Sequence, residues 1–278
     1  MGWDGSIGRS DLTMRLHISP CPNDTFIFHA LIHGLVDTEG LGFDVRFDDI
    51  EALNRAAIER DGEEDIVKIS YAALPEAVGA FRLLDSGSAL GHGNGPLLVS
   101  RRLIGAEEWS DVRVGIPGER TTANRLLSLL FPEAIHKRAM LFSEIAPAVA
   151  AGALEAGVLI HEGRFTYAAQ GLRLVADLGE LWERRTGLPI PLGGIVIHRR
   201  HGAEVAERVG RVIRRSIEYA QAHPEASAEF VRTHAQELEA EVRQKHISYF
   251  VNDYSLSLGA AGLEAVLRLT ALDRSVLL

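Results

Sequence analysis

The chain has 278 residues, enough for one large domain or for two lobes of roughly 130 residues each. Hydrophobic residues make up 46% of it, which excludes an intrinsically disordered chain. The formal net charge is −9, from 29 Lys and Arg against 38 Asp and Glu. A nucleic-acid-binding protein normally carries the opposite balance, so we expect no nucleic-acid partner, whereas a local basic pocket for a small anion stays compatible with this charge.

The cysteine count and the length of the apolar runs exclude further classes of protein. Cys21 is the single cysteine, which excludes an intramolecular disulfide and a Cys-rich zinc module. No apolar run approaches the ~18 residues of a membrane-spanning helix, so no membrane partner is expected. Residues 1–13 lack the basic, apolar and small-residue regions of a signal peptide. We therefore expect a cytoplasmic protein in which 1–13 form a short polar extension.

Strand and helix patterns alternate along the chain. Strands are predicted at 15–19, 43–47, 65–69, 96–100, 112–116, 156–160, 172–176 and 193–197, and helices at 23–35, 51–60, 71–81, 121–130, 144–151 and almost throughout 203–278. Such alternation predicts an α/β fold with mainly parallel sheets.

The strand–helix pattern restarts near Val112, which indicates two similar lobes. The runs 97–100 and 195–198 follow Gly/Pro-rich stretches and are the expected crossings between them. The prediction is a discontinuous first lobe, 14–100 plus 199–278, and an inserted second lobe, 101–198. A small ligand is expected in the cleft between them, at strand carboxyl ends and helix N-termini.

Polar clusters follow several predicted strands, at 19–25, 68–71, 117–122 and 161–164. Free N–H groups at helix starts attract anions, and Ser or Thr hydroxyls can donate there as well. This pattern suits a ligand with a carboxylate or many hydroxyls. The same residue types also cap helices, which would explain Asn23, Asp24 and Thr122, and Lys68 could equally extend from its strand to the surface.

Two further side chains could carry chemistry. His161 ends an apolar strand, where a histidine is more often structural, yet a strand end facing a cleft suits a general base because imidazole titrates near neutrality. Cys21 at a helix start is either a nucleophile or a packed thiol, and the sequence identifies no histidine partner for it.

Several cofactor and metal motifs are absent from the sequence. The stretch 91–95 is Gly-rich but precedes a strand, so it is no dinucleotide fingerprint, and there is no Walker A loop or G-x-S-x-G elbow. His29 and His33 lie four apart without a His-Glu-x-x-His motif. We expect no cofactor and no metal site.

As a set, the motifs of this chain resemble those of the 1,4-dihydroxy-6-naphthoate synthase family. They are Ser-Pro-Cys-Pro-Asn-Asp-Thr-Phe-Ile-Phe (19–28), Lys-Ile-Ser (68–70), Ser-Gly-x-Ala-Leu-Gly (86–91), Gly-Pro-Leu (95–97), Pro-Gly-x-x-Thr-Thr-Ala (117–123), Ile-His-Glu-x-Arg-Phe-Thr-Tyr (160–167), Trp-Glu-x-x-Thr-Gly-Leu-Pro-x-Pro-Leu-Gly (182–193), His-Ala-Gln-Glu (234–237) and Tyr-Phe-Val-Asn (249–252). The match runs in order from Met14 onward.

The resemblance implies an α/β, two-lobe fold like that of type II periplasmic binding proteins, with a central ligand cleft. It implies a lyase of the futalosine route to menaquinone, which converts cyclic dehypoxanthinyl futalosine to 1,4-dihydroxy-6-naphthoate and releases a sugar-derived fragment without a cofactor. The expected partner is thus a small anionic substrate. No oligomeric state is predicted.

The resemblance also implies roles for single residues. The family's general base falls on His161, and its substrate-binding segments fall on Lys68, Ile69, Ser70, Thr121 and Thr122. We expect Lys68 to meet the substrate carboxylate. Candidates to line the cleft besides these are Asn23, Asp24, Thr25 and Arg164.

Three other functions stay open at this point. The nearest is the sister enzyme chorismate dehydratase, against which the motifs at 19–25 and 160–167 argue. A solute-binding protein of a transporter would need an export signal. An effector-binding regulator domain would need a helix-turn-helix that 1–13 are too short to hold.

Overall fold

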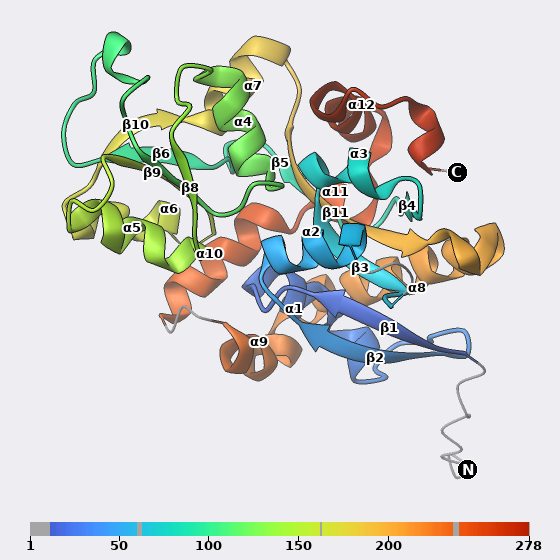
Figure 1. The fold of residues 1–278 in the computed structure, drawn as a ribbon. Helices are drawn as coiled ribbons and strands as arrows, with labels where there is room; N and C mark the ends of the chain where they lie inside the picture. Colours follow the sequence, from blue (N-terminus) through green and yellow to red (C-terminus); the bar gives the residue numbers. More distant parts are fainter. Residues whose placement is uncertain (1–11, 60–62, 162, 236–238, 278) are drawn as a thin grey trace, which may run out of the picture.

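The computed structural model describes residues 12–59, 63–161, 163–235 and 239–277. It contains two β-sheets with helices around each of them (Figure 1). The strands of the first sheet are β1 (Leu12–Ile18), β2 (Leu41–Phe47), β3 (Ile66–Ser70), β4 (Phe81–Leu83), β5 (Ala89–Gly91) and β11 (Ile190–His198). Those of the second are β6 (Leu97–Ser100), β7 (Val114–Ile116), β8 (Lys137–Ala139), β9 (Ala156–Leu159) and β10 (Arg173–Asp177).

The first strand begins earlier than the sequence predicts. Leu12 and Thr13 already pair with Leu41 and Gly42 of β2, although they were assigned to the N-terminal extension. The rest of that extension, 1–11, lies outside the described residues.

Strand directions are mixed in both sheets. The first sheet has the order β2-β1-β3-β11-β4, with β5 also paired to β11, and the second has the order β10-β6-β9-β7-β8. Strand β1 runs parallel to β2 and β3, and β7 runs parallel to β8 and β9. Strand β11 is antiparallel to β3, β4 and β5, and β6 is antiparallel to β9 and β10. The prediction of mainly parallel sheets is therefore wrong, because β6 and β11, the strands that enter from the other sheet, run antiparallel to all their neighbours.

The two crossing strands pair in the opposite sheets from those predicted. Residues 97–100 were assigned to the first lobe, but β6 pairs with β9 and β10 of the second sheet. Residues up to 198 were assigned to the second lobe, but β11 pairs with β3, β4 and β5 of the first. An apolar strand is compatible with either sheet, so its sequence does not reveal its partners. The chain therefore passes between the sheets in the loops that precede these strands, at 92–96 before β6 and at 187–189 before β11.

The helices surround the two sheets. They are α1 (Pro22–Ile32), α2 (Ile50–Glu59), α3 (Leu74–Ala77), α4 (Thr122–Leu130), α5 (Phe142–Ala150), α6 (Gly163–Thr166), α7 (Leu178–Thr186), α8 (Gly202–Ala222), α9 (Ala228–His234), α10 (Ala240–Phe250), α11 (Asp253–Leu256) and α12 (Gly259–Thr270). The helix predicted at 71–81 is shorter, a 3₁₀ turn followed by α3, and β4 already begins at Phe81. Within the described ranges, no helix is both long and apolar enough to cross a membrane.

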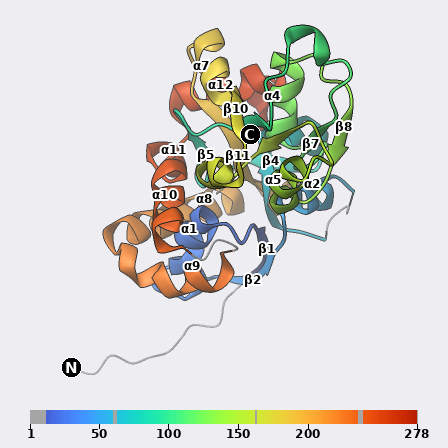
Figure 2. The same ribbon diagram turned by 90° about the vertical axis from the view of Figure 1, so that its left-hand side faces the viewer.

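Helix α1 lies at the centre of the first lobe. Its residues are buried from Pro22 to Leu31, and the buried set includes the polar side chains of Asn23, Asp24, Thr25 and His29. Helices α8, α9 and α10 pack around it (Figure 2). The hydroxyl of Ser216 in α8 donates to the Ile27 carbonyl at 2.6 Å and accepts from the Leu31 N–H at 3.1 Å. These contacts fix the second half of α1, the helix whose first residues carry part of the candidate site.

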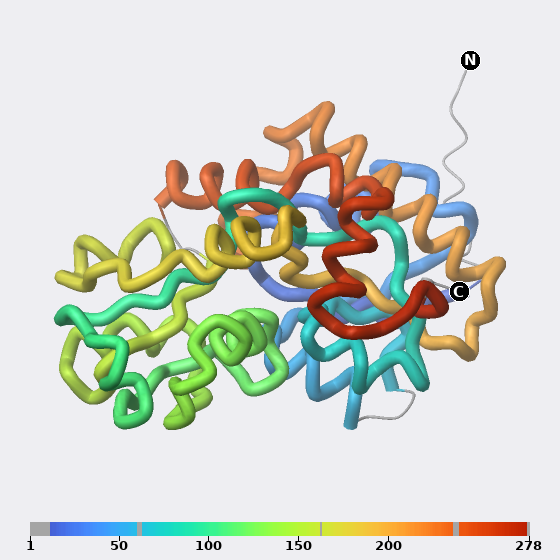
Figure 3. Tube along the Cα trace, turned by 90° about the horizontal axis from the view of Figure 1, so that it is seen from above, coloured from blue at the N-terminus to red at the C-terminus, as the bar shows by residue number. Residues whose placement is uncertain are grey.

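One apolar cluster extends through both sheets. It includes Ile69 of β3, Leu98 of β6 and Val158 of β9, all fully buried. Tyr71 also belongs to this core, where burial raises the pKa of its phenol and its hydroxyl lies 2.7 Å from that of Ser88. Seen from above in Figure 3, the second sheet (green to yellow) lies beside the first rather than over it. The shared core therefore holds the two sheets in a fixed relation.

Gly95, just before β6, lies against the backbone of Gly179 at the start of α7, so close that a Cβ would overlap Gly179 Cα. We expect Gly95→Ala to lower the free energy of unfolding by about 1–3 kcal/mol, as overpacking does. Gly79 has open space around it, and Gly79→Ala should change stability by less than about 0.5 kcal/mol. Urea denaturation of both variants provides the measurement, and equal losses would contradict the close approach.

Candidate functional site

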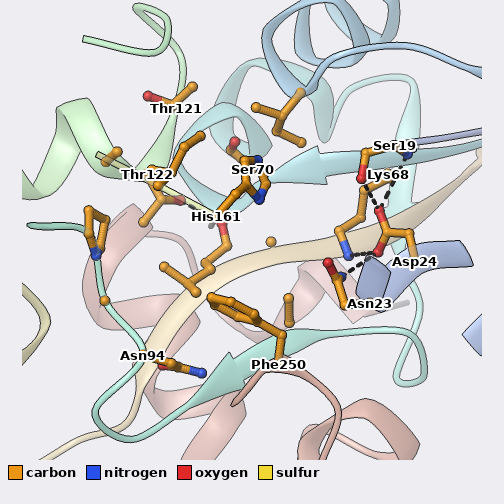
Figure 4. Close-up of a pocket in the computed structure, with 18 of the residues that line it drawn as sticks. Ser19, Asn23, Asp24, Lys68, Ser70, Asn94, Thr121, Thr122, His161 and Phe250 are labelled. Carbon is orange, nitrogen blue, oxygen red and sulfur yellow. Dashed lines mark hydrogen bonds and ion pairs between the residues drawn. The ribbon is translucent and has the colours of Figure 1, made fainter. Parts of the chain in front are cut away.

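A pocket with an internal volume of about 90 Å³, partly open to solvent, lies between the two sheets (Figure 4). It is lined by Ser19, Asn23, Asp24, Ile50, Lys68, Ser70, Ala89, Asn94, Gly95, Pro96, Thr121, Thr122, Ala123, Ile160, His161, Arg164, Leu192, Gly193, His246 and Phe250. The walls come from strands of the first sheet, from loops beside the second sheet, and from α1, α4 and α10.

The pocket brings together all four polar clusters that the sequence predicts. Of the predicted site residues, those that line it are Asn23, Asp24, Lys68, Ser70, Thr121, Thr122, His161 and Arg164. Thr25 and Ile69 do not line it: both side chains are fully buried, and the Thr25 hydroxyl donates to the Cys21 carbonyl at 3.1 Å. Side chains alternate along a strand, so Ile69 points to the core while Lys68 and Ser70 face the pocket.

Other lining residues were not predicted. His246 and Phe250 come from α10, and Asn94 comes from the loop before β6. The sequence indicates no role for Asn94, and His246 belongs to none of its named motifs. Their placement depends on how α10 packs against α1, which leaves no signal in the local sequence.

Lys68 and Asp24 form a buried ion pair at the base of the pocket. The Lys68 ammonium lies 2.8 Å from Asp24 Oδ1, and the two residues are 5% and 1% exposed. Asp24 Oδ2 accepts a hydrogen bond from the Ser19 hydroxyl at 2.6 Å. Gly193 of β11 lies close against β3, where a Cβ would come within 2.6 Å of the Ile69 carbonyl oxygen. The surface position considered for Lys68 is therefore wrong.

Asn23 and Asp24 serve the pocket rather than the helix cap. The N-cap of α1 is Cys21, which makes no capping hydrogen bond through its side chain, and Pro22 is the first helical residue. Asn23 Nδ2 donates to Asp24 Oδ1 at 2.8 Å. The capping interpretation of these two residues is therefore wrong.

Ser70 is oriented by a buried asparagine of α2. Asn54 Nδ2 donates to the Ser70 hydroxyl oxygen at 3.2 Å, and Asn54 Oδ1 accepts from the Ser70 N–H at 2.8 Å. Because its oxygen already accepts this bond, the Ser70 hydroxyl can present its own hydrogen to a ligand in the pocket.

The two threonines at the start of α4 use their hydroxyls internally. Thr121 is the N-cap, accepting from Asn124 N–H at 3.3 Å and donating to the Gly118 carbonyl at 2.8 Å. The Thr122 hydroxyl donates to the Leu192 carbonyl at 2.7 Å and accepts from the Ala72 N–H at 3.3 Å. What α4 offers the pocket is thus its first N–H groups, which have no acceptor within the helix.

Arg120 ties this end of α4 to the first sheet's helices. Its guanidinium reaches Glu59 at 3.0 Å and Glu76 at 3.2 Å. Its backbone N–H donates to the Glu51 carboxylate at 3.3 Å, and burial raises the pKa of that carboxyl. These contacts hold the α4 N-terminus against the pocket.

His161 lies two residues beyond the end of β9, with its backbone in the left-handed region at φ 53°. A non-glycine residue in this region stores strain, a feature that clusters at functional sites. The ring packs edge-on against Phe142, with ring centres 4.8 Å apart. Burial lowers the pKa of His161 to about 4, partly offset by the charge of Asp24. The ring is therefore neutral at physiological pH.

Cys21 lies in contact with the His161 ring. Its sulfur lies 3.5 Å from Nδ1 and 3.7 Å from Nε2 of His161, 140 positions along the chain. No local sequence signal predicts this pair, because Cys21 follows β1 of the first sheet and His161 follows β9 of the second.

Arg164 anchors the loop that carries Asn94 and Gly95. Its guanidinium donates to the Gly95 carbonyl at 2.8 Å and to Asp177 at 3.3 Å, and lies 5.3 Å from the centre of the Tyr249 ring. The charge of Arg164 is thus compensated by protein groups. Across the described ranges, no group of three or more His, Cys, Asp or Glu side chains is placed to hold a metal ion.

Comparison with known sequences identifies relatives over nearly the whole chain. A family model described as menaquinone biosynthesis matches residues 14–274. A Thermus thermophilus protein named 1,4-dihydroxy-6-naphthoate synthase is 46% identical over 258 residues, 93% of each chain. A Streptomyces coelicolor protein of the same name is 43% identical over 262 residues, 91% of this chain and 90% of its own.

Solved structures agree with the two-lobe expectation. A crystal structure of an Archaeoglobus fulgidus protein superposes with a TM-score of 0.86 at 35% identity, covering 92% of this chain and 95% of that one. A Candida albicans protein described as having the generic periplasmic binding protein fold gives a TM-score of 0.66 at 11% identity, covering 95% and 93%. The latter similarity concerns the fold alone, and it confirms a periplasmic-binding-protein-like fold.

Asp24→Asn tests the buried ion pair. The amide cannot neutralise the Lys68 ammonium, so we expect the free energy of unfolding to fall by about 3–5 kcal/mol, the usual cost of a buried charge left unpaired. The exposed pair of Glu229 and Arg232 provides the control, since Glu229→Gln should cost less than about 1 kcal/mol. A similar small loss for both variants in chemical denaturation would show that the buried pair is not needed for stability.

The lowered pKa of His161 predicts a pH-dependent stability. The unfolded chain binds a proton at this ring from about pH 6.5 downward, whereas the folded ring does so only near pH 4. The free energy of unfolding should therefore decrease as the pH is lowered through this window, by about 1–2 kcal/mol between pH 7 and pH 5 from His161 alone. Over the same pH change, the free energy of unfolding of His161→Gln should decrease by about 1–2 kcal/mol less than that of the wild type. His223→Gln, which alters an exposed histidine, should show the same decrease as the wild type. Denaturant titrations at both pH values decide the matter, and parallel losses in all three proteins would contradict the assignment.

Proposed function

Because this chain belongs to the menaquinone biosynthesis family, we propose that it acts as a 1,4-dihydroxy-6-naphthoate synthase. In this proposal the chain is a cytoplasmic carbon–carbon lyase. It converts cyclic dehypoxanthinyl futalosine to 1,4-dihydroxy-6-naphthoate with release of a sugar-derived fragment and without a cofactor. The observation that best supports the proposal is that one pocket contains both a neutral, strained His161 and several hydrogen-bond donors.

His161 is the proposed general base. Its neutral ring has a lone pair available to remove a substrate proton and start the carbon–carbon cleavage, which formation of the naphthalene ring favours. A base works best with a pKa near the working pH. An anionic substrate bound beside His161 would raise the pKa of the ring toward that range, as the charge of Asp24 already does.

The substrate carboxylate is proposed to bind at Ser70 and the start of α4. The Ser70 hydroxyl can donate its hydrogen, and the first N–H groups of α4 point an ordered set of donors and the positive end of a helix dipole into the same corner. This replaces Lys68 as the main carboxylate partner, since Asp24 already compensates its charge. Lys68 retains N–H groups that can assist.

The remaining rate acceleration is proposed to come from orientation and exclusion of water. The pocket lies between the two sheets and is bordered by α10, so bound substrate would be held against His161 in one geometry. Thr121 and Thr122 contribute by fixing the α4 N-terminus, through their bonds to Gly118 and Leu192.

His161→Gln tests the base directly. General-base assistance contributes typically ~10²–10⁴-fold, so kcat should fall by at least about 100-fold while KM changes little. The assay incubates purified protein with cyclic dehypoxanthinyl futalosine, with no cofactor added, and follows dihydroxynaphthoate by chromatography. His223→Gln, which alters an exposed histidine, serves as the control and should keep wild-type turnover.

Two outcomes would revise the proposal. Near-normal turnover by His161→Gln would remove this residue from the role of base. Failure of the wild-type protein to form product, with the compound still raising its Tm, would instead favour a solute-binding protein or a sister enzyme with another substrate.

A further inference from the structure

A second histidine, His246 of α10, lines the pocket beside the proposed base. It is 1% exposed, and its ring lies nearly parallel to that of His161, with ring centres 5.7 Å apart and planes inclined by 17°. His246 Nε2 lies 3.0 Å from Asn23 Oδ1. His246 has no role in the proposed proton abstraction or carboxylate binding.

The hydrogen-bond chain through Asn23 fixes the tautomer of His246. The Asp24 carboxylate, held by Lys68, can only accept, so the Asn23 amide must turn its Nδ2 toward it, at 2.8 Å. Asn23 Oδ1 then faces His246 and can only accept as well, which places the ring hydrogen on Nε2. In the neutral ring, Nδ1 therefore carries a lone pair.

The ring of His246 stays neutral in this setting. Burial lowers its pKa well below the ordinary value, and the nearby His161 and Lys68 lower it further. Nδ1 is buried and has no hydrogen-bond partner in the part of the chain that the structure describes. A buried acceptor left unpaired is costly, so this atom is suited to a donor brought by a ligand.

Asn94 presents a second acceptor of the same kind. Its Nδ2 donates to the backbone carbonyl of Tyr249 in α10 at 2.9 Å, which leaves Oδ1 as the free acceptor of the amide. Asn94 is 1% exposed, and its Oδ1 also finds no partner among the described residues. Asn94 and Phe250 lie in Figure 4 on the side of the pocket opposite Thr121 and Ser70.

The pocket therefore has two chemically different sides. The side of Ser70 and the α4 N-terminus offers hydrogen-bond donors, whereas the side of α10 offers the acceptors His246 Nδ1 and Asn94 Oδ1. A carboxylate suits the first side, and hydroxyl groups suit the second.

We propose that His246 and Asn94 form a hydroxyl-binding subsite, which accepts hydrogen bonds from the sugar-derived part of the substrate. The subsite rests on the proposed function and adds to it the direction in which the substrate lies. The carboxylated ring points to Ser70, the sugar points to α10, and His161 is placed between them.

Variants of His246 separate its two nitrogens. Glutamine places its amide where Nε2 lies, so His246→Gln keeps a donor for Asn23 and removes the Nδ1 acceptor. We expect its KM to rise about tenfold while kcat stays within about threefold, because a uniform binding contact is lost. Asparagine reaches only to Nδ1, so His246→Asn should recover part of the KM loss by supplying an acceptor there. A purely structural role would not produce this order.

His29→Gln is the matched control, since His29 is also a buried histidine and does not line the pocket. It should keep the wild-type KM. A wild-type KM for His246→Gln, or an equal loss for Gln and Asn, would overturn the subsite.

A spectroscopic readout needs no variant and no turnover. In protein labelled with ¹⁵N-histidine, His246 should show a neutral ring with hydrogen on Nε2, and its Nδ1 signal should move when cyclic dehypoxanthinyl futalosine is added. A hydrogen on Nδ1, or an unmoved signal with bound compound, would overturn the subsite. Absence of turnover by the wild type would instead overturn the proposed function, and the two failures are thus distinguishable.

Discussion

The buried ion pair between Lys68 and Asp24 is the interaction on which the site depends. It joins the first helix of the chain to β3, the middle strand of the first sheet, and burial of either charge alone would be strongly unfavourable. The pair also sets the direction of the hydrogen bonds that run from Asp24 to α10. Asp24 orients the Asn23 amide, which in turn orients His246 on α10. One electrostatic constraint therefore determines hydrogen-bond directions on three separate elements.

The sequence predicts site residues well where they lie at or directly after the end of an apolar strand. Ser70 and His161 could be expected in the cleft because both end apolar strands, and the structure brings both to the pocket. The same reasoning identified Thr121 and Thr122 correctly as residues of the cleft. It did not foresee that their hydroxyls are used internally, because the acceptor for Thr122 is a carbonyl of β11, far along the chain.

What could not be predicted depends on pairing between distant segments. Strand β11 is apolar enough for either sheet, and its partners decide that it belongs to the first. Cys21 meets His161 across 140 positions, and Asn94 meets α10 across 155. Hydrophobic periodicity describes the surroundings of each segment and carries no information on which segment packs against it.

The insertion of β11 between β3 and β4 has a consequence for synthesis of the chain. A ribosome delivers β3 and β4 long before residue 198, so the growing first sheet has to wait with an unpaired edge beside β3. Such an edge can join another chain, which makes this interval the aggregation-prone stage of biogenesis. The ligand pocket is completed later still, when α10 has emerged. Newly made protein would thus complete the cleft only after every strand of both sheets has been synthesised.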